Sequence, residues 1–172
     1  MSIVLRTLPL PVELQGRIWL TSMPGRFAPL ADFMDAAQTV GATGVVCLAL
    51  KKETVAKSPD YAQAIASGSL SLRILFHPIP DFGLPENVGA FGHFVQELCV
   101  SLRQGERLIV HCAAGVGRTG LVARHLLMAL GVDPQSAQTL VKSAGSSPET
   151  PQQNEFCNYP LSLLDIIPET DS

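Results

Sequence analysis

The sequence predicts an α/β protein with a central, mostly parallel sheet of about four or five strands flanked by helices. Apolar runs alternate along the chain with amphipathic segments, which is the pattern of helices packed on a sheet. One run, VVCLAL at residues 45–50, is apolar throughout, as expected of a strand buried on both faces. The chain has 172 residues, long enough for one core and too short for two comfortable ones, so we expect a single domain over residues 1–172.

The first expected elements form one β–α–β unit. A strand is predicted in GRIWL, residues 16–20, and a helix over residues 29–41. Apolar residues recur at helical spacing within that helix, at Leu30, Phe33, Met34 and Ala37. Gly41 ends the pattern, and the strand at residues 45–50 then completes the unit.

A second, shorter helix is predicted over residues 58–68. Ser58 stands at its N-cap position, Pro59 at its first helical position and Gly68 at its end. A strand follows in SLRILFHPI and is expected to end before the pair of prolines in HPIP.

The second half of the chain repeats this alternation. Residues 85–103 give the clearest amphipathic helix, with apolar residues every three or four places. A short buried strand at residues 107–111 and a helix over residues 120–131 follow. Another helix is expected from Asp133 onwards, and the segment from about 150 to 165 has a helical pattern again.

Composition excludes several classes of function. The formal net charge is −3 and Lys and Arg are not clustered, so we expect neither a nucleic-acid partner nor attraction to an acidic membrane surface. Arg6 interrupts the apolar N-terminus, which argues against a signal peptide, and the apolar runs fall short of a membrane span. The cysteines are too scattered for a metal cage, at 47, 99, 112 and 157. We expect a cytoplasmic protein without a metal or other cofactor.

The stretch HCAAGVGRTG, residues 111–120, predicts a phosphate cradle between a strand and a helix. Backbone N–H groups that precede a helix N-terminus attract anions, and glycines let consecutive amides converge on one ligand. The residues expected to contribute those amides are Ala113, Ala114, Gly115, Val116 and Gly117. Arg118 offers a planar fork for two oxygens of a phosphoryl group. The loop lacks the Lys-Ser/Thr ending of ATP-binding loops.

Cys112 is the expected nucleophile. The amides and the helix end that attract phosphate also stabilise a thiolate. A thiolate at the base of the cradle can attack phosphorus in line and form a phosphocysteine intermediate. We expect Thr119 to donate a hydrogen bond to the sulfur and His111 to fix the loop by hydrogen bonds rather than act as a base.

The motif HCAAGVGRT resembles the signature of the cysteine-dependent protein phosphatases, which is His-Cys, five residues, Arg, then Ser or Thr. PIPDFGLPE resembles the general-acid loop of the small atypical dual-specificity phosphatases, and ETPQQNEF resembles their C-terminal glutamine segment. GRIWLTSMPGRF is similar to the opening segment of relatives of the kinase-associated phosphatase. The resemblance covers nearly the whole chain and implies a phosphatase-like fold with the nucleophile loop between a strand and a helix.

The resemblance also implies roles outside the cradle. Asp81 becomes the general acid that protonates the leaving group and later activates water; the alternative is that it caps a turn. Gln153 becomes the glutamine that positions the hydrolytic water, although the neighbouring Gln152 could take that role. Cys47 is either a second cysteine that forms a reversible disulfide with the nucleophile or a core thiol.

We therefore predict a monomeric protein phosphatase that hydrolyses phosphotyrosine, with phosphoserine and phosphothreonine as further candidates. Lipid phosphatases of this superfamily carry lysines where this loop has Ala and Val, so an inositol lipid is disfavoured as a substrate. Two alternatives stay open. One is a phosphate-reading binding module without turnover, and the other is a phosphatase for small phosphometabolites or RNA 5′ ends.

Overall fold

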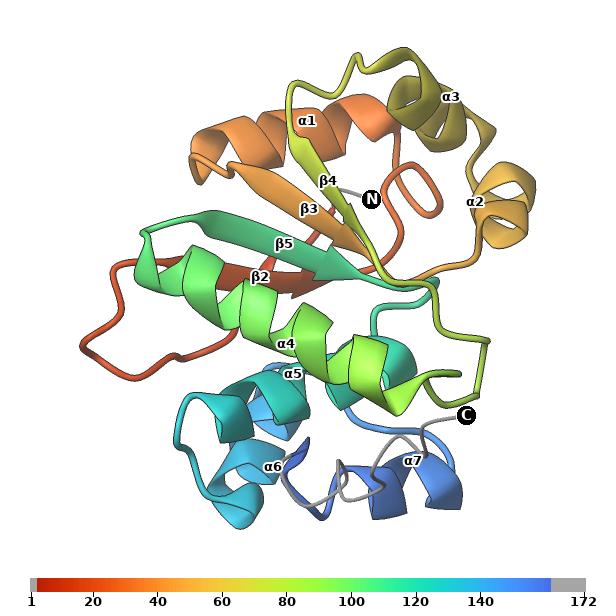
Figure 1. The fold of residues 1–172 in the computed structure, drawn as a ribbon. Coiled ribbons are helices and arrows are strands. Elements are labelled where there is room, and N and C mark those ends of the chain that lie inside the picture. The colour runs from red at the N-terminus through yellow and green to blue at the C-terminus, as the bar shows by residue number, and fades with distance from the viewer. Residues whose placement is uncertain (1–2, 162–172) are drawn as a thin grey trace, which may run out of the picture.

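A sheet of five strands separates two layers of helices in the computed structural model, which describes residues 3–161 (Figure 1). The strands are β1 Arg6–Thr7, β2 Arg17–Thr21, β3 Gly44–Cys47, β4 Arg73–Phe76 and β5 Arg107–His111. The helices are α1 Leu30–Thr39, α2 Lys51–Lys57, α3 Pro59–Ser67, α4 Val88–Arg103, α5 Gly117–Ala129, α6 Pro134–Ser143 and α7 Pro151–Phe156. The predicted α/β class is confirmed.

The strands follow the order β1-β2-β5-β3-β4. All pairs are parallel except β1 with β2, so the predicted mostly parallel sheet is also confirmed. Strand β5 lies at the centre, with Thr21 of β2 and Cys47 of β3 as the register partners of His111. The carboxyl ends of β2, β3 and β5 therefore meet at one edge of the sheet, where ligands bind in folds of this kind.

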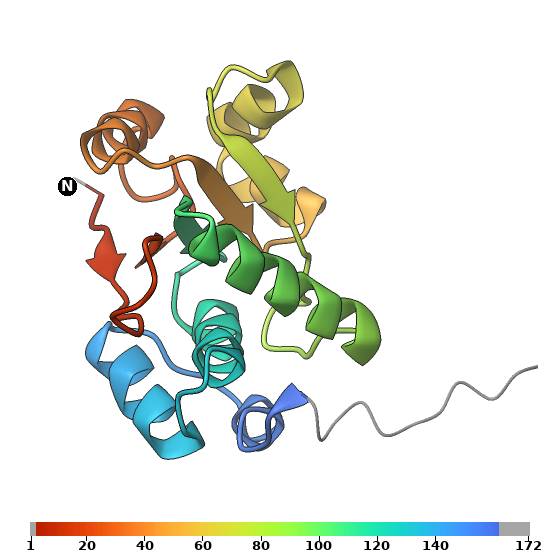
Figure 2. The same cartoon turned by 60° about the vertical axis from the view of Figure 1, so that its left-hand side comes forward.

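Alternate residues of the central strands enter different cores. Leu108 and Val110 of β5 join the core under α4 and α5, whereas Ile109 packs with Phe33 of α1. Figures 1 and 2 show these two helical layers on opposite sides of the sheet, with α6 and α7 beyond α5. The two-residue period of a strand, with apolar residues at every position, produces this double burial.

The structure corrects several predicted boundaries. Strand β3 ends at Cys47 rather than residue 50, because the chain turns into α2. Helix α2 was not predicted, since only Thr54 of its seven residues is buried and no apolar period marks it. The short edge strand β1 was not predicted either. Helix α5 begins at Gly117, inside the predicted cradle, and α7 ends at Phe156. Positions 162–165 of the predicted last helix lie outside the described residues.

The start of α3 differs from the predicted cap in its chemistry. Ser58 occupies the N-cap position, but its hydroxyl makes no capping bond and is buried without a hydrogen-bond partner among the described residues. Gly68 follows the last residue of the helix, as predicted, and its φ of 70° lies in the left-handed region that glycine favours at helix ends.

Candidate active site

The loop between β5 and α5 surrounds the sulfur of Cys112 with hydrogen-bond donors. The Gly115 N–H donates to Sγ over 3.3 Å, and the Thr119 hydroxyl donates over 3.2 Å. Gly115 has φ +77°, and a Cβ at this position would overlap the carbonyl of Thr21. Only glycine fits this conformation and this close approach. The loop places together the residues predicted to form the cradle, Ala113, Ala114, Gly115, Val116 and Gly117.

His111 is buried at the end of β5 and holds the loop from behind. Its Nδ1 lies 2.8 Å from the carbonyl of Cys112, which can only accept, so Nδ1 carries the proton. Nε2 then accepts from the Tyr61 hydroxyl at 2.7 Å. Burial and the nearby charge of Arg118 lower the pKa of His111 to about 4, although the bond to Cys112 opposes them. The imidazole is neutral at pH 7 and has no free nitrogen to act as a base.

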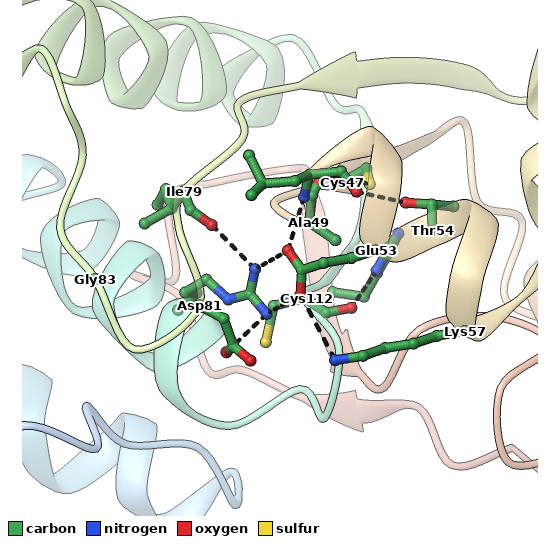
Figure 3. Close-up of polar contacts among 12 residues, drawn as sticks. Cys47, Ala49, Glu53, Thr54, Lys57, Ile79, Asp81, Gly83 and Cys112 are labelled. Carbon is green, nitrogen blue, oxygen red and sulfur yellow. Dashed lines mark hydrogen bonds and ion pairs between the residues drawn. The ribbon is translucent and has the colours of Figure 1, made fainter.

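The guanidinium of Arg118 is held by Glu53, a residue that sequence reasoning missed (Figure 3). Glu53 lies on α2 and accepts from Nη1 at 2.8 Å and Nη2 at 2.9 Å. It also accepts from the Leu50 N–H at 3.0 Å, which is one half of a capping box. Burial raises the pKa of Glu53, but the bonds and charge of Arg118 outweigh it, so the pKa is lowered overall. The signal in the sequence was a Glu three residues after the N-cap position at Leu50.

The remaining donors of Arg118 connect the cradle to the predicted acid loop. Nη1 donates to the Ile79 carbonyl and Nη2 to Asp81 Oδ1, both over 3.0 Å. Arg118 has five N–H bonds, so these contacts and those to Glu53 occupy the four on Nη1 and Nη2. The side chain of Asp81 is 43% exposed, whereas that of Glu53 is 11% exposed. The Asp81 contact is therefore the one that a ligand can replace most readily.

Gln153 has no exposed surface, and both ends of its side chain are hydrogen-bonded. Oε1 accepts from the Glu149 N–H at 2.8 Å and from the Thr150 N–H at 3.4 Å, and the second of these bonds belongs to the capping box of α7. Nε2 donates to the Gly83 carbonyl at 2.9 Å. These bonds link α7 to the acid loop and use one of the two hydrogens on Nε2. Gln152 is exposed, and the water-positioning role of either glutamine stays a prediction.

Arg6 of β1 reaches the back of the cradle, a contact that the sequence did not suggest. Its Nη2 donates to the Gly115 carbonyl over 2.6 Å, and Nη1 donates to the Ala144 carbonyl over 2.8 Å. The Ser146 hydroxyl donates to the same Gly115 carbonyl over 2.6 Å. Two donors thus hold this carbonyl away from the ligand side of the loop, and Arg6 brings a positive charge toward Cys112.

Cys47 lies beside His111 in the sheet, next to the nucleophile position. Burial raises the pKa of Cys47 to about 11, although bonds to Ala49 and Thr54 and the charge of Arg118 act against it. The cysteines at 47, 99, 112 and 157 are all unbridged. Because exchange needs a thiolate, the protonated thiol of Cys47 favours its interpretation as a core residue.

The hollows of the surface differ in their chemistry. One of about 300 Å³ opens beside the cradle and is lined by Ala114, Val116 and Arg6 among others. A larger one of about 610 Å³ lies against α2, α3 and β4 and is lined mostly by apolar side chains. An apolar lining does not suit a phosphoryl group, and neither hollow is lined by Cys112, Arg118 or Asp81. The candidate site is therefore defined by the contacts around Cys112 and Arg118 rather than by either hollow.

Residues 3–161 contain no group of three or more His, Cys, Asp or Glu side chains arranged to hold a metal ion. Within the same residues, no helix combines the length and apolar character needed to cross a bilayer.

Comparison of sequences relates the chain to phosphatases. Residues 20–156 match the family model described as Swiss Army Knife protein, DSP-PTPase phosphatase domain. The chain is also 40% identical over 101 residues to cyclin-dependent kinase inhibitor 3 of Rattus norvegicus. That alignment covers 56% of this chain and 47% of the relative, so the chain spans about half the length of the relative.

Solved structures share the fold. A crystal structure of kinase-associated phosphatase, with its catalytic cysteine substituted by serine, superposes with a TM-score of 0.79 and 19% identity and covers 91% of this chain and 93% of that chain. Tk-PTP in the active form superposes with a TM-score of 0.67 and 24% identity, covering 88% and 92% of the two chains.

Proposed function

The chain belongs to the DSP-PTPase phosphatase domain family, an atypical dual-specificity branch of the cysteine-dependent phosphatases, and on this basis we propose that it hydrolyses phosphotyrosine in protein substrates. Phosphoserine and phosphothreonine are further candidate substrates. The proposed nucleophile is Cys112, the proposed phosphate-binding arginine is Arg118 and the proposed general acid is Asp81.

The observation that carries this proposal is the exchangeable contact between Arg118 and Asp81 at the mouth of the cradle. A phosphoryl group that enters the cradle would take Nη2 from Asp81 and bind Nε as well, so two oxygens would face the guanidinium. The Asp81 carboxyl would then be released from Arg118 and could face the leaving oxygen of the substrate. The arrival of the substrate would thus bring the proposed acid into position.

The proposed reaction has two steps. In the first, the Cys112 sulfur attacks phosphorus, the S–P bond forms, the P–O bond to the substrate breaks, and Asp81 gives its proton to the leaving oxygen. In the second, water attacks phosphorus, its proton passes to the Asp81 carboxylate, and the S–P bond breaks to release phosphate. Hydrogen bonds from Gly115 and Thr119 stabilise the thiolate that attacks and leaves.

A protein substrate agrees with the composition and the comparisons. The net charge of −3 disfavours RNA, and the rat relative is named as a kinase inhibitor. We propose that the chain acts as a monomer. We also propose a cytoplasmic location, because the reaction needs Cys112 in its reduced form and reducing compartments keep cysteines reduced.

Turnover of p-nitrophenyl phosphate and of a phosphotyrosine peptide tests the proposal directly. The wild-type chain should hydrolyse both, and Cys112→Ser should lose at least about 10³-fold in rate, since an oxygen nucleophile with no base beside it reacts slowly. Equal rates for the two proteins would refute catalysis by Cys112.

Asp81→Ala separates an enzyme from a binding module. Because general acids contribute about 10² to 10⁴-fold, the variant of an enzyme should turn over slowly and retain a bound phosphopeptide. A module that only binds phosphate should show no turnover in either form. Nucleotides and phosphometabolites assayed beside the peptide would show whether protein is the preferred substrate.

A further inference from the structure

Arg124 of α5 is a buried cation with few partners. It is 2% exposed, and its bond among the described residues runs from Nη2 to the Cys157 carbonyl over 3.3 Å. Its Nε is buried and has no hydrogen-bond partner within residues 3–161. No carboxylate in that part of the chain forms an ion pair with it. A buried guanidinium in this condition is costly unless an anion accompanies it.

Arg124 borders a small hollow between α5, α6 and the segment that leads to α7. The hollow has a volume of about 170 Å³. We call it the α5–α6 pocket; its polar lining consists of Arg124, Gln138, Lys142, Ser146, Ser147 and Asn154. Two of these side chains are cationic, the others are amides or hydroxyls, and none is acidic.

We propose that the α5–α6 pocket is a second anion site that binds a free tetrahedral oxyanion of the phosphate class, with Arg124 as its buried anchor and Lys142 at its rim. Arg124 lines the pocket, and the guanidinium hydrogens that carry no bond among the described residues would supply donors to the oxygens of the ion. The volume fits such an ion with a little water, because each water takes roughly 30 Å³. It is smaller than the roughly 300 Å³ at which pockets for larger ligands begin.

The pocket shares a wall with the cradle. The Ser147 N–H donates to the Val116 carbonyl over 3.2 Å, and the Ser146 hydroxyl donates to the Gly115 carbonyl. Close packing also joins the two places, since a Cβ at Gly120 would press on the backbone of Ser147. An ion in the pocket would therefore steady the segment that holds the back of the cradle. Inorganic phosphate, the product of the proposed reaction, is the natural probe.

Equilibrium dialysis with radiolabelled inorganic phosphate tests this site in the full chain. Phosphate bound at the cradle is common to all variants, so the measured quantity is the difference in bound equivalents. Arg124→Met should bind one equivalent fewer than the wild type, because the loss of charged hydrogen bonds weakens affinity about 10- to 150-fold. This difference is expected whether or not the cradle turns over phosphate, so failure of the proposed function would be seen separately.

Two matched variants keep the test decisive if Arg124→Met does not fold. Lys142→Met removes an exposed charge at the rim of the pocket and should weaken the affinity for the second equivalent of phosphate about two- to fivefold. Arg103→Met removes an exposed charge that does not line the pocket and should leave binding unchanged. Equal binding by the wild type, Lys142→Met and Arg124→Met would overturn the proposal. So would crystals soaked in tungstate that show no density beside Arg124.

Discussion

The cradle and the acid loop meet at Arg118, but they are held in different ways. The cradle is fixed from behind by His111, Ser146 and Arg6, and its residues are mostly buried. The acid loop is anchored at the buried Ile79 and Pro85, whereas Asp81 and Phe82 between them are exposed. Phe82 even adopts a positive φ of 57°. The cradle is thus preformed, while the acid carboxylate occupies a position that it can leave when phosphate arrives.

The largest effect should come from the residue that joins the two regions. Arg118→Lys keeps the charge but loses the fork that serves Glu53, Asp81 and phosphate together. We expect kcat/KM for a phosphotyrosine peptide to fall roughly 10²- to 10³-fold, as for loss of one catalytic donor. Arg107→Lys, at the opposite end of β5, is the control and should stay close to wild type. Normal activity in the Arg118→Lys variant would mean that the fork is not used.

Loss of Glu53 should lower the stability of the folded chain, because Glu53 holds the guanidinium that joins the cradle to the acid loop. Glu53→Gln removes the charge that pairs with Arg118, and we expect the free energy of unfolding at pH 7 to fall by about 1.5–3 kcal/mol. The pKa of Glu53 is lowered in the folded chain, so its contribution is fully present above the ordinary value of 4.5 and is lost as pH falls below it. Urea unfolding from pH 3 to 7 should show the two proteins converging at low pH. A gap that does not narrow between pH 7 and pH 3 would contradict this account.

Gln153 tests how the acid loop is held. Gln153→Glu keeps the acceptor for the Glu149 N–H and removes the donor to the Gly83 carbonyl. We expect the turnover rate to fall about tenfold with phenyl phosphate and less with p-nitrophenyl phosphate. The second substrate has a better leaving group, which needs less help from an acid. Exposed Gln152→Glu is the matched control. If Gln153 positions water instead, both substrates should lose rate equally and phosphocysteine should accumulate.

Substitution of Arg6 should have the smallest effect, and it should change the reactivity of the nucleophile Cys112 rather than the position of the acid Asp81. Arg6→Met removes a half-buried positive charge near Cys112, and we expect the rate of alkylation by iodoacetate at pH 7 to fall about two- to fivefold. Arg6→Lys keeps the positive charge and should lose less of the rate. Arg17→Met, whose guanidinium contacts the carbonyls of residues 14–16, should leave the rate unchanged. An alkylation rate unaffected by Arg6→Met would remove Arg6 from the site.

Most of the strands and long helices could be predicted from the sequence. The spacing of their apolar residues and the residues at their ends are both visible within a short stretch of the chain. The helix of residues 85–103 and the strand of residues 107–111 appeared close to their predicted places. Helix α2 and strand β1 were missed for the opposite reason. They bury little surface of their own, so no periodic signal marks them, and contacts with distant segments stabilise them.

The cradle could be predicted because it is a local feature of the chain. Cys112, the small residues after it and Arg118 lie within seven positions, so backbone geometry brings them together whatever the rest of the chain does. The surroundings of the cradle depend instead on the folded arrangement. Glu53 and Arg6 reach it from elements far away in the sequence, and Gln153 bonds to the acid loop through the half-buried carbonyl of Gly83. A side chain's partner across the fold depends on packing and burial, and these are properties of the assembled chain that no local pattern encodes.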